Sequence, residues 1–132
     1  MITADSHIDI RQAAERFRQR AAARQARLDD RFERAWQDCR AIIALIIEKY
    51  HPVRLYQWGS LLHRQKFSEI SDIDLAVEGL ASPEQFFALY GDAEALTDFP
   101  LDLVELEHVD PLHQTSIRRK GRLVYERTDG SS

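Results

Sequence analysis

The sequence has 132 residues, of which 44% are hydrophobic and 30% are charged, with a formal net charge of −4. This length and composition predict one compact, soluble domain with a real core and exclude a long disordered chain. The longest apolar run, residues 41–47, is too short to cross a bilayer, and the N-terminus lacks the apolar segment of a signal peptide. We therefore expect a cytoplasmic protein with no membrane partner.

The single cysteine, Cys39, excludes an internal disulfide. No second thiol or histidine cluster lies near it in the sequence, so we expect it in the core rather than in a zinc site or a redox pair. The five histidines show no helical pair of ligands, and we assign them no metal role.

Charge is unevenly distributed along the chain. Residues 11–40 contain nine arginines and five acidic residues, whereas residues 67–110 contain twelve acidic residues and no lysine or arginine. Carboxylates without basic neighbours repel one another unless solvent, distant basic groups or bound cations offset the charge. The charge run alone favours a solvated acidic surface, and only the placement of the acids can indicate a cation site.

The N-terminal third has the pattern of a long helix. Residues 8–50 contain no proline or glycine, and apolar residues recur every three or four positions, which predicts one long helix or two: Leu28, Phe32, Ala35, Cys39, Ile42 and Ile46. Arginines crowd the part before Leu28, so this part cannot bury much surface. We expect residues 1–40 to form an arginine-rich helical extension that contacts a partner or a second chain, and His51-Pro52 to end the helix.

The rest of the chain alternates between predicted strands and helices. Four β-branched or alternating runs predict strands at residues 53–58, 72–77, 101–106 and 122–126. Capping signals at Ser82-Pro83 and Asp110-Pro111 predict helices, the first of which Gly91-Asp92 is expected to interrupt. We expect Tyr56 and Trp58 to be packing residues of the first strand, and residues 128–132 to form a disordered tail.

Gly59 and Ser60 follow the first strand and precede a short predicted helical stretch. Glycine allows a phosphate to approach the backbone, a serine hydroxyl can donate a hydrogen bond, and a helix start offers unpaired N–H groups. The dipeptide alone is a weak signal, because most such turns are structural.

Three acidic residues interrupt predicted strands. Asp72 and Asp74 share the face opposite Ile73, Leu75 and Val77, and Asp102 is the polar exception in another strand. Neighbouring strands would bring all three carboxylates to one patch. Hard oxygen ligands without histidine or cysteine suit two Mg²⁺ ions. Each acid alone is more often structural, but the ordered set, together with Gly59-Ser60, favours a site for a metal–nucleotide complex.

The motifs GS, SDIDLAV, FPLDLVELEHV and IRRKGRLVYER resemble the minimal nucleotidyltransferase domain of the DNA polymerase β superfamily, of the type that acts as antitoxin to a HEPN-domain toxin. The resemblance covers residues 41–127. It implies an α/β (α+β) fold, a small mixed sheet with helices packed on one side, here preceded by the long N-terminal helix.

The resemblance also implies roles for the site residues. Gly59 and Ser60, with Arg64 as the nearby basic residue, would bind the nucleotide. Asp72, Asp74 and Asp102 would be the catalytic residues and the ligands of two Mg²⁺ ions, and Asp102 would help to deprotonate the acceptor hydroxyl.

The function that follows is an antitoxin enzyme, which transfers AMP from ATP to a hydroxyl of the HEPN ribonuclease toxin, expected to be a tyrosine hydroxyl, and so neutralises it. Two alternatives remain. One is a catalytically silent antitoxin that acts by binding alone, and the other is a nucleotidyltransferase that modifies RNA or a small molecule. Acids interspersed among the arginines of the extension favour a solvated helix or a protein interface over a nucleic-acid partner, and an oligomer through this helix is possible.

Overall fold

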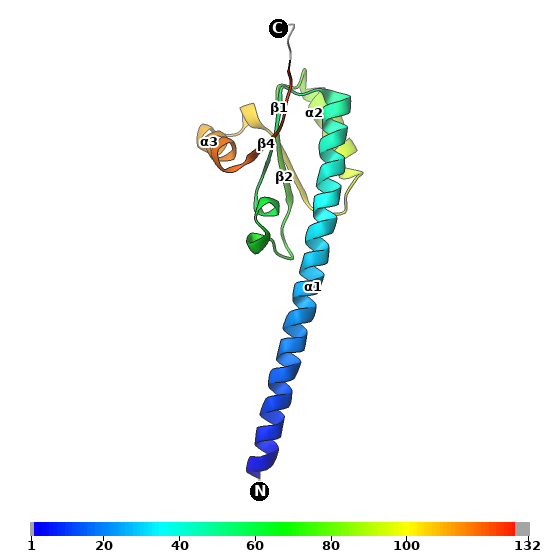
Figure 1. Ribbon diagram of the computed structural model, residues 1–132. Helices are drawn as coiled ribbons and strands as arrows, with labels where there is room; N and C mark the ends of the chain where they lie inside the picture. Colours follow the sequence, from blue (N-terminus) through cyan, green and yellow to red (C-terminus); the bar gives the residue numbers. More distant parts are fainter. Residues whose placement is uncertain (1, 129–132) are drawn as a thin grey trace.

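The computed structural model describes residues 2–128, with side chains described from residue 9 onward. Three α-helices, four strands and three short 3₁₀ turns follow one another along the described chain (Figure 1). In order they are α1 (Ile2–Tyr50), β1 (Arg54–Trp58), η1 (Ser60–Leu62), η2 (Arg64–Lys66), β2 (Ile73–Glu78), α2 (Pro83–Glu94), β3 (Leu101–Glu105), η3 (Leu106–His108), α3 (Pro111–Lys120) and β4 (Arg122–Glu126).

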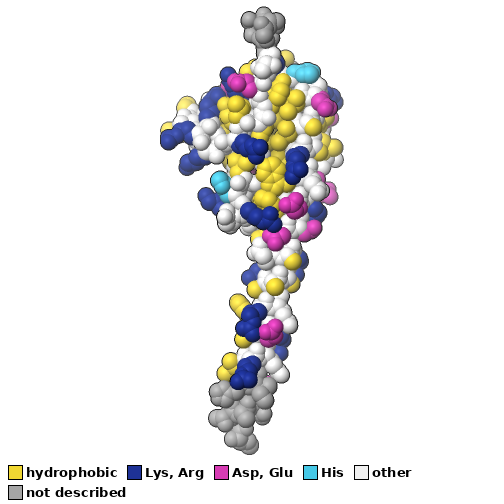
Figure 2. Space-filling view, viewed as in Figure 1, with side chains coloured by type: hydrophobic (Ala, Val, Ile, Leu, Met, Phe, Trp, Pro, Cys, Tyr) yellow, Lys and Arg dark blue, Asp and Glu magenta, His cyan; other side chains and the backbone are white. Residues whose placement is uncertain are grey.

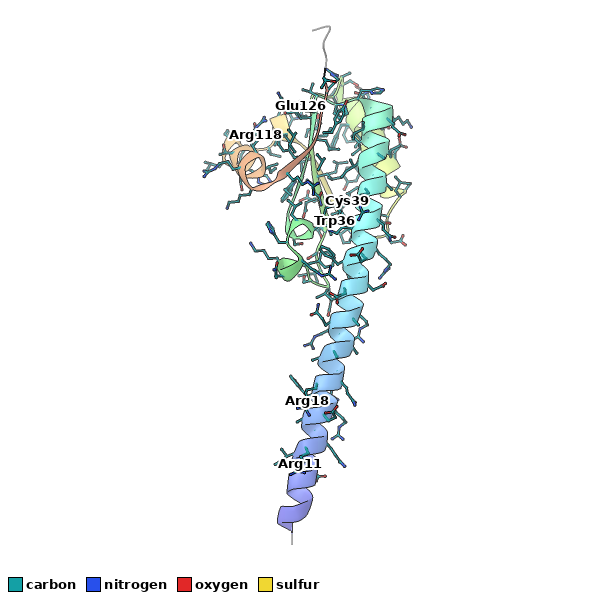
Figure 3. The ribbon with its side chains drawn as sticks, viewed as in Figure 1. Arg11, Arg18, Trp36, Cys39, Arg118 and Glu126 are labelled. Atoms are coloured by element: carbon teal, nitrogen blue, oxygen red, sulfur yellow. The ribbon has the colours of Figure 1, made fainter. Side chains whose placement is uncertain are left out.

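The first helix, α1, is a single continuous helix of 49 residues. It ends where expected: His51 takes a left-handed conformation with φ 48°, and Pro52 follows. The apolar spacing predicted from the sequence is confirmed, because one stripe of α1 is buried against the sheet: Phe32, Ala35, Cys39, Ile42, Ile46 and Tyr50. Cys39 is a core residue as predicted (Figure 3), and burial raises the pKa of its thiol to about 12.

The four strands form one mixed sheet in the order β3-β2-β1-β4. Strand β1 pairs antiparallel with both β2 and β4, and β2 pairs parallel with β3. The parallel pair is joined through α2, the helix expected between these two strands.

Helices cover the two faces of the sheet unequally. Helices α1 and α2 pack on one face, where Leu55, Leu75 and Leu103 belong to the main core cluster. Helix α3 lies against the opposite face, where Ile117 packs with Tyr56 in a smaller cluster (Figure 1). The expected arrangement of helices on one side thus holds for α1 and α2, while α3 leaves much of the second face open.

Two local expectations were wrong. Helix α2 continues through Gly91 to Glu94, because Leu89 and Ala93 on either side of the glycine are fully buried and hold the last turn against the core. After Gly59, the chain forms two separate 3₁₀ turns, η1 and η2, instead of one helical stretch.

The described part of α1 before Phe32 has no buried side chain. Leu28 still packs partly buried against the core, and before it the helix projects from the domain as a rod (Figure 1). Within the described residues, no helix combines the length and the hydrophobicity that crossing a membrane requires. The predicted tail lies almost wholly outside the described residues.

Candidate active site

Two of the three predicted carboxylates lie on neighbouring strands. Asp74 of β2 is the direct partner of Asp102 of β3 in the parallel pair, and on its other side it is paired with Trp58 of β1. Asp72 lies just before β2 and, by alternation, on the same face as Asp74. The structure thus places all three acids on the face of the sheet that α3 only partly covers.

The carboxyl groups of Asp74 and Asp102 have raised pKa values, because they are partly removed from solvent and lie near other carboxylates. Burial is the main cause that raises the pKa of Asp74 to about 7, and the charges of Asp102 and Asp72 add to it. The pKa of Asp102 is also raised, by burial and then by Asp72, while nearby His113 acts in the opposite direction. Ionisation of these carboxyl groups is thus unfavourable, and a bound cation would make it more favourable.

Gly59 lies directly beneath the carboxylate of Asp74. Its φ of 84° belongs to the left-handed region, which disfavours residues with a side chain. A Cβ atom at this position would overlap the Oδ2 atom of Asp74. Glycine is therefore needed both for the turn after β1 and for the close approach of this backbone to Asp74.

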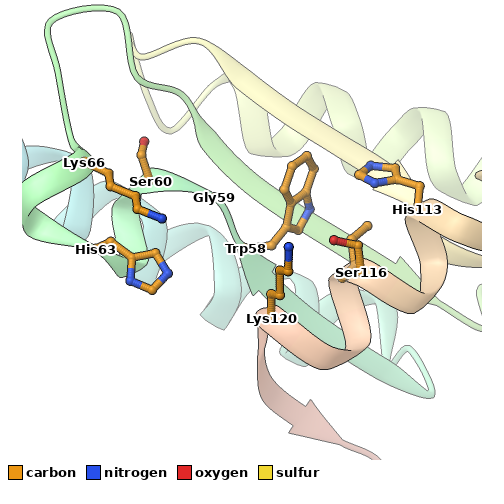
Figure 4. Close-up of a pocket in the computed structure, with 9 residues that line it drawn as sticks. Trp58, Gly59, Ser60, His63, Lys66, His113, Ser116 and Lys120 are labelled. Atoms are coloured by element: carbon orange, nitrogen blue, oxygen red, sulfur yellow. The ribbon is translucent and has the colours of Figure 1, made fainter.

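A pocket of about 300 Å³ opens beside Gly59. Its polar lining comes from two sides: His63 and Lys66 follow the turn after β1, and α3 presents His113, Ser116 and Lys120 toward them (Figure 4). The complete lining is Trp58, Gly59, Ser60, His63, Lys66, His113, Ser116, Ile117 and Lys120. Two lysines and two histidines around a cavity of this size suit an anionic ligand such as a polyphosphate.

Trp58 connects the pocket to the carboxylates. Its indole ring meets the ring of His113 edge to face, with the centroids 5.1 Å apart, and its neighbour across the strands is Asp74. The tryptophan was expected only to pack in the first strand, as Tyr56 does, but it also forms part of the pocket wall.

Sequence reasoning missed the contribution of α3. The basic residues at the end of this helix were interpreted only as complements to the helix dipole. His113, Ser116 and Lys120 recur at steps of three and four, so they share one helical face. This spacing was a usable signal, but only the position of α3 over the sheet shows that this face is turned to Gly59.

Arg64 is placed away from this pocket. Its guanidinium lies 3.0 Å from the carboxylate of Asp29 and 3.9 Å from that of Glu33, and it stacks over the ring of Phe32 at 4.9 Å. These contacts fasten η2 to α1. A direct role of Arg64 in nucleotide binding would require it to leave them, and that role remains a prediction.

The donor set fits a hard divalent cation, although the carboxylates do not outline a complete site. Asp72, Asp74 and Asp102 offer oxygen ligands, which Mg²⁺ prefers. Burial, with added repulsion between the carboxylates, raises the pKa of Asp74 and of Asp102, and a cation would offset both effects. Among the described side chains, however, no three histidines, cysteines or acids are grouped closely enough to hold an ion as they stand. Mg²⁺ is commonly held by only one or two carboxylates together with water and substrate phosphates, so a partial set is consistent with this ion.

Comparison with known families assigns most of the chain. Residues 41–130 match the family described as polymerase beta, nucleotidyltransferase. The match includes all three carboxylates, Gly59 and the whole pocket. A comparison with curated protein sequences gives no match.

Proposed function

Since the chain belongs to the polymerase β nucleotidyltransferase family, we propose that it transfers AMP from ATP to a hydroxyl group of a partner protein. The hydroxyl oxygen attacks the α-phosphorus, the bond to the β-phosphate breaks, and pyrophosphate leaves. One observation carries this proposal: Asp74 and Asp102 lie side by side on paired strands, next to a glycine turn that borders a cationic pocket. The cationic groups of the pocket can bind the negatively charged triphosphate of ATP, and the neighbouring carboxylates can bind the cations that accompany it.

The pocket residues bind and orient the triphosphate. The backbone at Gly59 lets a phosphate approach closely, and the hydroxyl of Ser60 can donate a hydrogen bond to it. The ammonium groups of Lys66 and Lys120 neutralise phosphate charge from opposite sides of the cavity. Together they direct the α-phosphate toward the carboxylates.

The three carboxylates would hold two Mg²⁺ ions. Bound there, the ions supply neutralisation of the phosphate charge and make an acceptor hydroxyl more acidic. Asp74, the most buried of the three, lies against the nucleotide turn and anchors this arrangement.

Asp102 is suited to accept the proton of the acceptor hydroxyl. Its side chain is only half-buried, so an incoming group can reach it, and its raised pKa makes it a better base than an exposed aspartate. His113 lies close enough to Asp102 to act against this rise of its pKa.

The acceptor in this proposal is a HEPN-domain ribonuclease toxin, modified on a tyrosine, and the chain is its antitoxin. This choice rests on the resemblance of SDIDLAV, FPLDLVELEHV and IRRKGRLVYER to antitoxin nucleotidyltransferases. A protein acceptor also agrees with a sheet face that α3 covers only in part, because a large partner needs open access to Asp102.

The test is a transfer reaction with ATP labelled at the α-phosphate, Mg²⁺ and the candidate toxin. Label should appear on the toxin with the natural protein and be lost with Asp72→Asn combined with Asp74→Asn, because this change removes the anchor of the ions. The matched control, Glu69→Gln combined with Asp98→Asn, removes the same charge from exposed positions and should retain transfer. Transfer from the γ-phosphate instead would indicate a kinase, and toxin binding without any transfer would leave an antitoxin that acts by binding alone.

A further inference from the structure

The projecting part of α1, residues 9–27, is a surface without a partner, and we call it the arm. None of its side chains is buried, and its two large apolar residues, Ile10 and Phe17, are each 65% exposed. Arg11 and Arg18 extend from it into open space (Figure 3). A rod of this kind gains stability when another surface covers its apolar residues.

The arm combines an apolar stripe with positive charge. Ile10, Ala14, Phe17 and Ala21 follow one another at steps of four, three and four, so they lie along one face. Six arginines and two acids give the arm a net charge of +4. Arg18 pairs with Glu15 at 2.7 Å, whereas the other five arginines form no ion pair with a side chain that the structure describes.

The exposed face of α2 has the complementary composition. Phe87 lies on this face and is 73% exposed, and the small exposed side chains of Ala88 and Ala95 lie beside it. Glu84 and Glu94 lie on the same face at steps of three and seven from Phe87, and within the described residues neither forms an ion pair. This apolar patch flanked by acids lies in the segment 67–110, which contains no lysine or arginine.

We propose that the arm packs against the exposed face of α2 in a second copy of the chain. The apolar stripe from Ile10 to Ala21 and the α2 face from Glu84 to Ala95 each span eleven steps, about 16 Å at 1.5 Å per residue. The apolar stripe of the arm then covers Phe87 of the other copy, and arginines of the arm flank Glu84 and Glu94. Two other occupants fit less well. Two arms side by side would repel each other because both are basic, and nucleic acid would leave the apolar stripe exposed to solvent.

The shape of the molecule allows the contact to be reciprocal. Helix α2 packs beside the domain half of α1, and the arm forms the other half of the same rod (Figure 1). Two rods placed antiparallel bring each arm alongside the domain of the other copy, so a two-fold axis forms both contacts at once. Figure 2 shows basic side chains along the projecting rod, on the face in view.

The experiment measures the mass of the full chain by sedimentation equilibrium in low salt. Wild type should form a dimer of twice 15.3 kDa. Glu84→Arg with Glu94→Arg, and separately Arg20→Glu with Arg24→Glu, should each raise the dimer dissociation constant at least about tenfold, or 1.4 kcal/mol. All four positions are exposed, so circular dichroism should show unchanged helix content.

Mixing the two charge-reversed proteins provides the decisive result. In the mixed dimer the arm that carries Arg20→Glu and Arg24→Glu, now without net charge, meets the α2 face with two added arginines. The other, basic arm meets an unchanged acidic α2 face, so dimers should return. Phe87→Ala should weaken the wild-type dimer without changing any charge. A monomeric wild type at about 100 µM, a dimer that the reversals do not weaken, or a mixture that stays monomeric would each overturn the proposal. So would arm-dependent RNA binding in a chain that remains monomeric.

Discussion

At the scale of single residues, function and stability conflict at Asp74. The side chain is 8% exposed, and its pKa of about 7 in the folded protein lies well above the usual value of 3.8. Between these two pH values the unfolded chain loses its proton while the folded chain keeps it. The free energy of unfolding therefore falls as pH rises through this window, by about 2 to 4 kcal/mol.

Asp74→Asn should accordingly stabilise the protein in the presence of a chelator. At about pH 3, below the usual pKa of 3.8, the carboxyl is largely protonated in both states, so variant and wild type should unfold at similar urea concentrations. At pH 8 the full penalty is present in the wild type, and the variant should be more stable by about 2 to 4 kcal/mol. The exposed change Asp98→Asn should show no such dependence on pH, and an equal gain for Asp74→Asn at both pH values would contradict the explanation.

Prediction of single residues from the sequence succeeded where the alternation of side chains along a strand determines on which face of the sheet a residue lies. The alternation of β2 placed Asp72 and Asp74 opposite the core, and the structure agrees. The same reasoning could not foresee Gln57, a fully buried residue of the apolar face whose amide has no hydrogen-bond partner among the described residues. Nor could it show that Arg64 contacts Asp29 of α1, because that contact joins residues 35 positions apart in the chain.

At the scale of elements, the position of α3 turns a strand-and-turn motif into a pocket. Its start was predictable: Asp110 caps the helix by accepting a hydrogen bond from the backbone N–H of His113 at 3.0 Å, and Pro111 follows. Its location was not, because sequence periodicity defines the buried face of a helix and not the side of the sheet that the helix covers. The four strands themselves were found, since each is a short run of alternating, aromatic or β-branched residues between turns.

Lys120 of α3 should contribute directly to nucleotide affinity. Lys120→Ala should raise the dissociation constant for ATP about tenfold, because it removes a cation from the pocket wall. Arg119→Ala removes the same charge from the same helical turn but does not line this pocket, and it should change affinity little. Calorimetric titration with ATP and Mg²⁺ compares the two variants, and equal losses would mean that only the overall charge of α3 matters.

At the scale of the whole molecule, the two halves of α1 differ in both charge and packing. The arm is basic and makes no buried contact, whereas the domain half of α1 is held by Phe32, Ala35 and Cys39. The apolar spacing predicted a helix throughout, and the arginines before Leu28 indicated that this part buries little surface, in agreement with a first buried side chain at Phe32. An isolated helical segment opens readily, because its stability in a protein comes mainly from packing.

Trypsin should therefore cut the dilute protein first in the arm. Arginines between Arg11 and Arg27 are exposed on a helix that can open locally, whereas Arg34 and Arg40 are also exposed but lie on turns whose other face is buried in the core. Mass spectrometry should show early fragments that begin after an arm arginine and retain the whole sheet. Early cleavage at Lys66, in the turn between β1 and β2, would show that this loop opens more readily than the arm. If a second copy covers the arm, the same cleavage should slow as protein concentration rises, because bound helix is protected from opening in proportion to its occupancy.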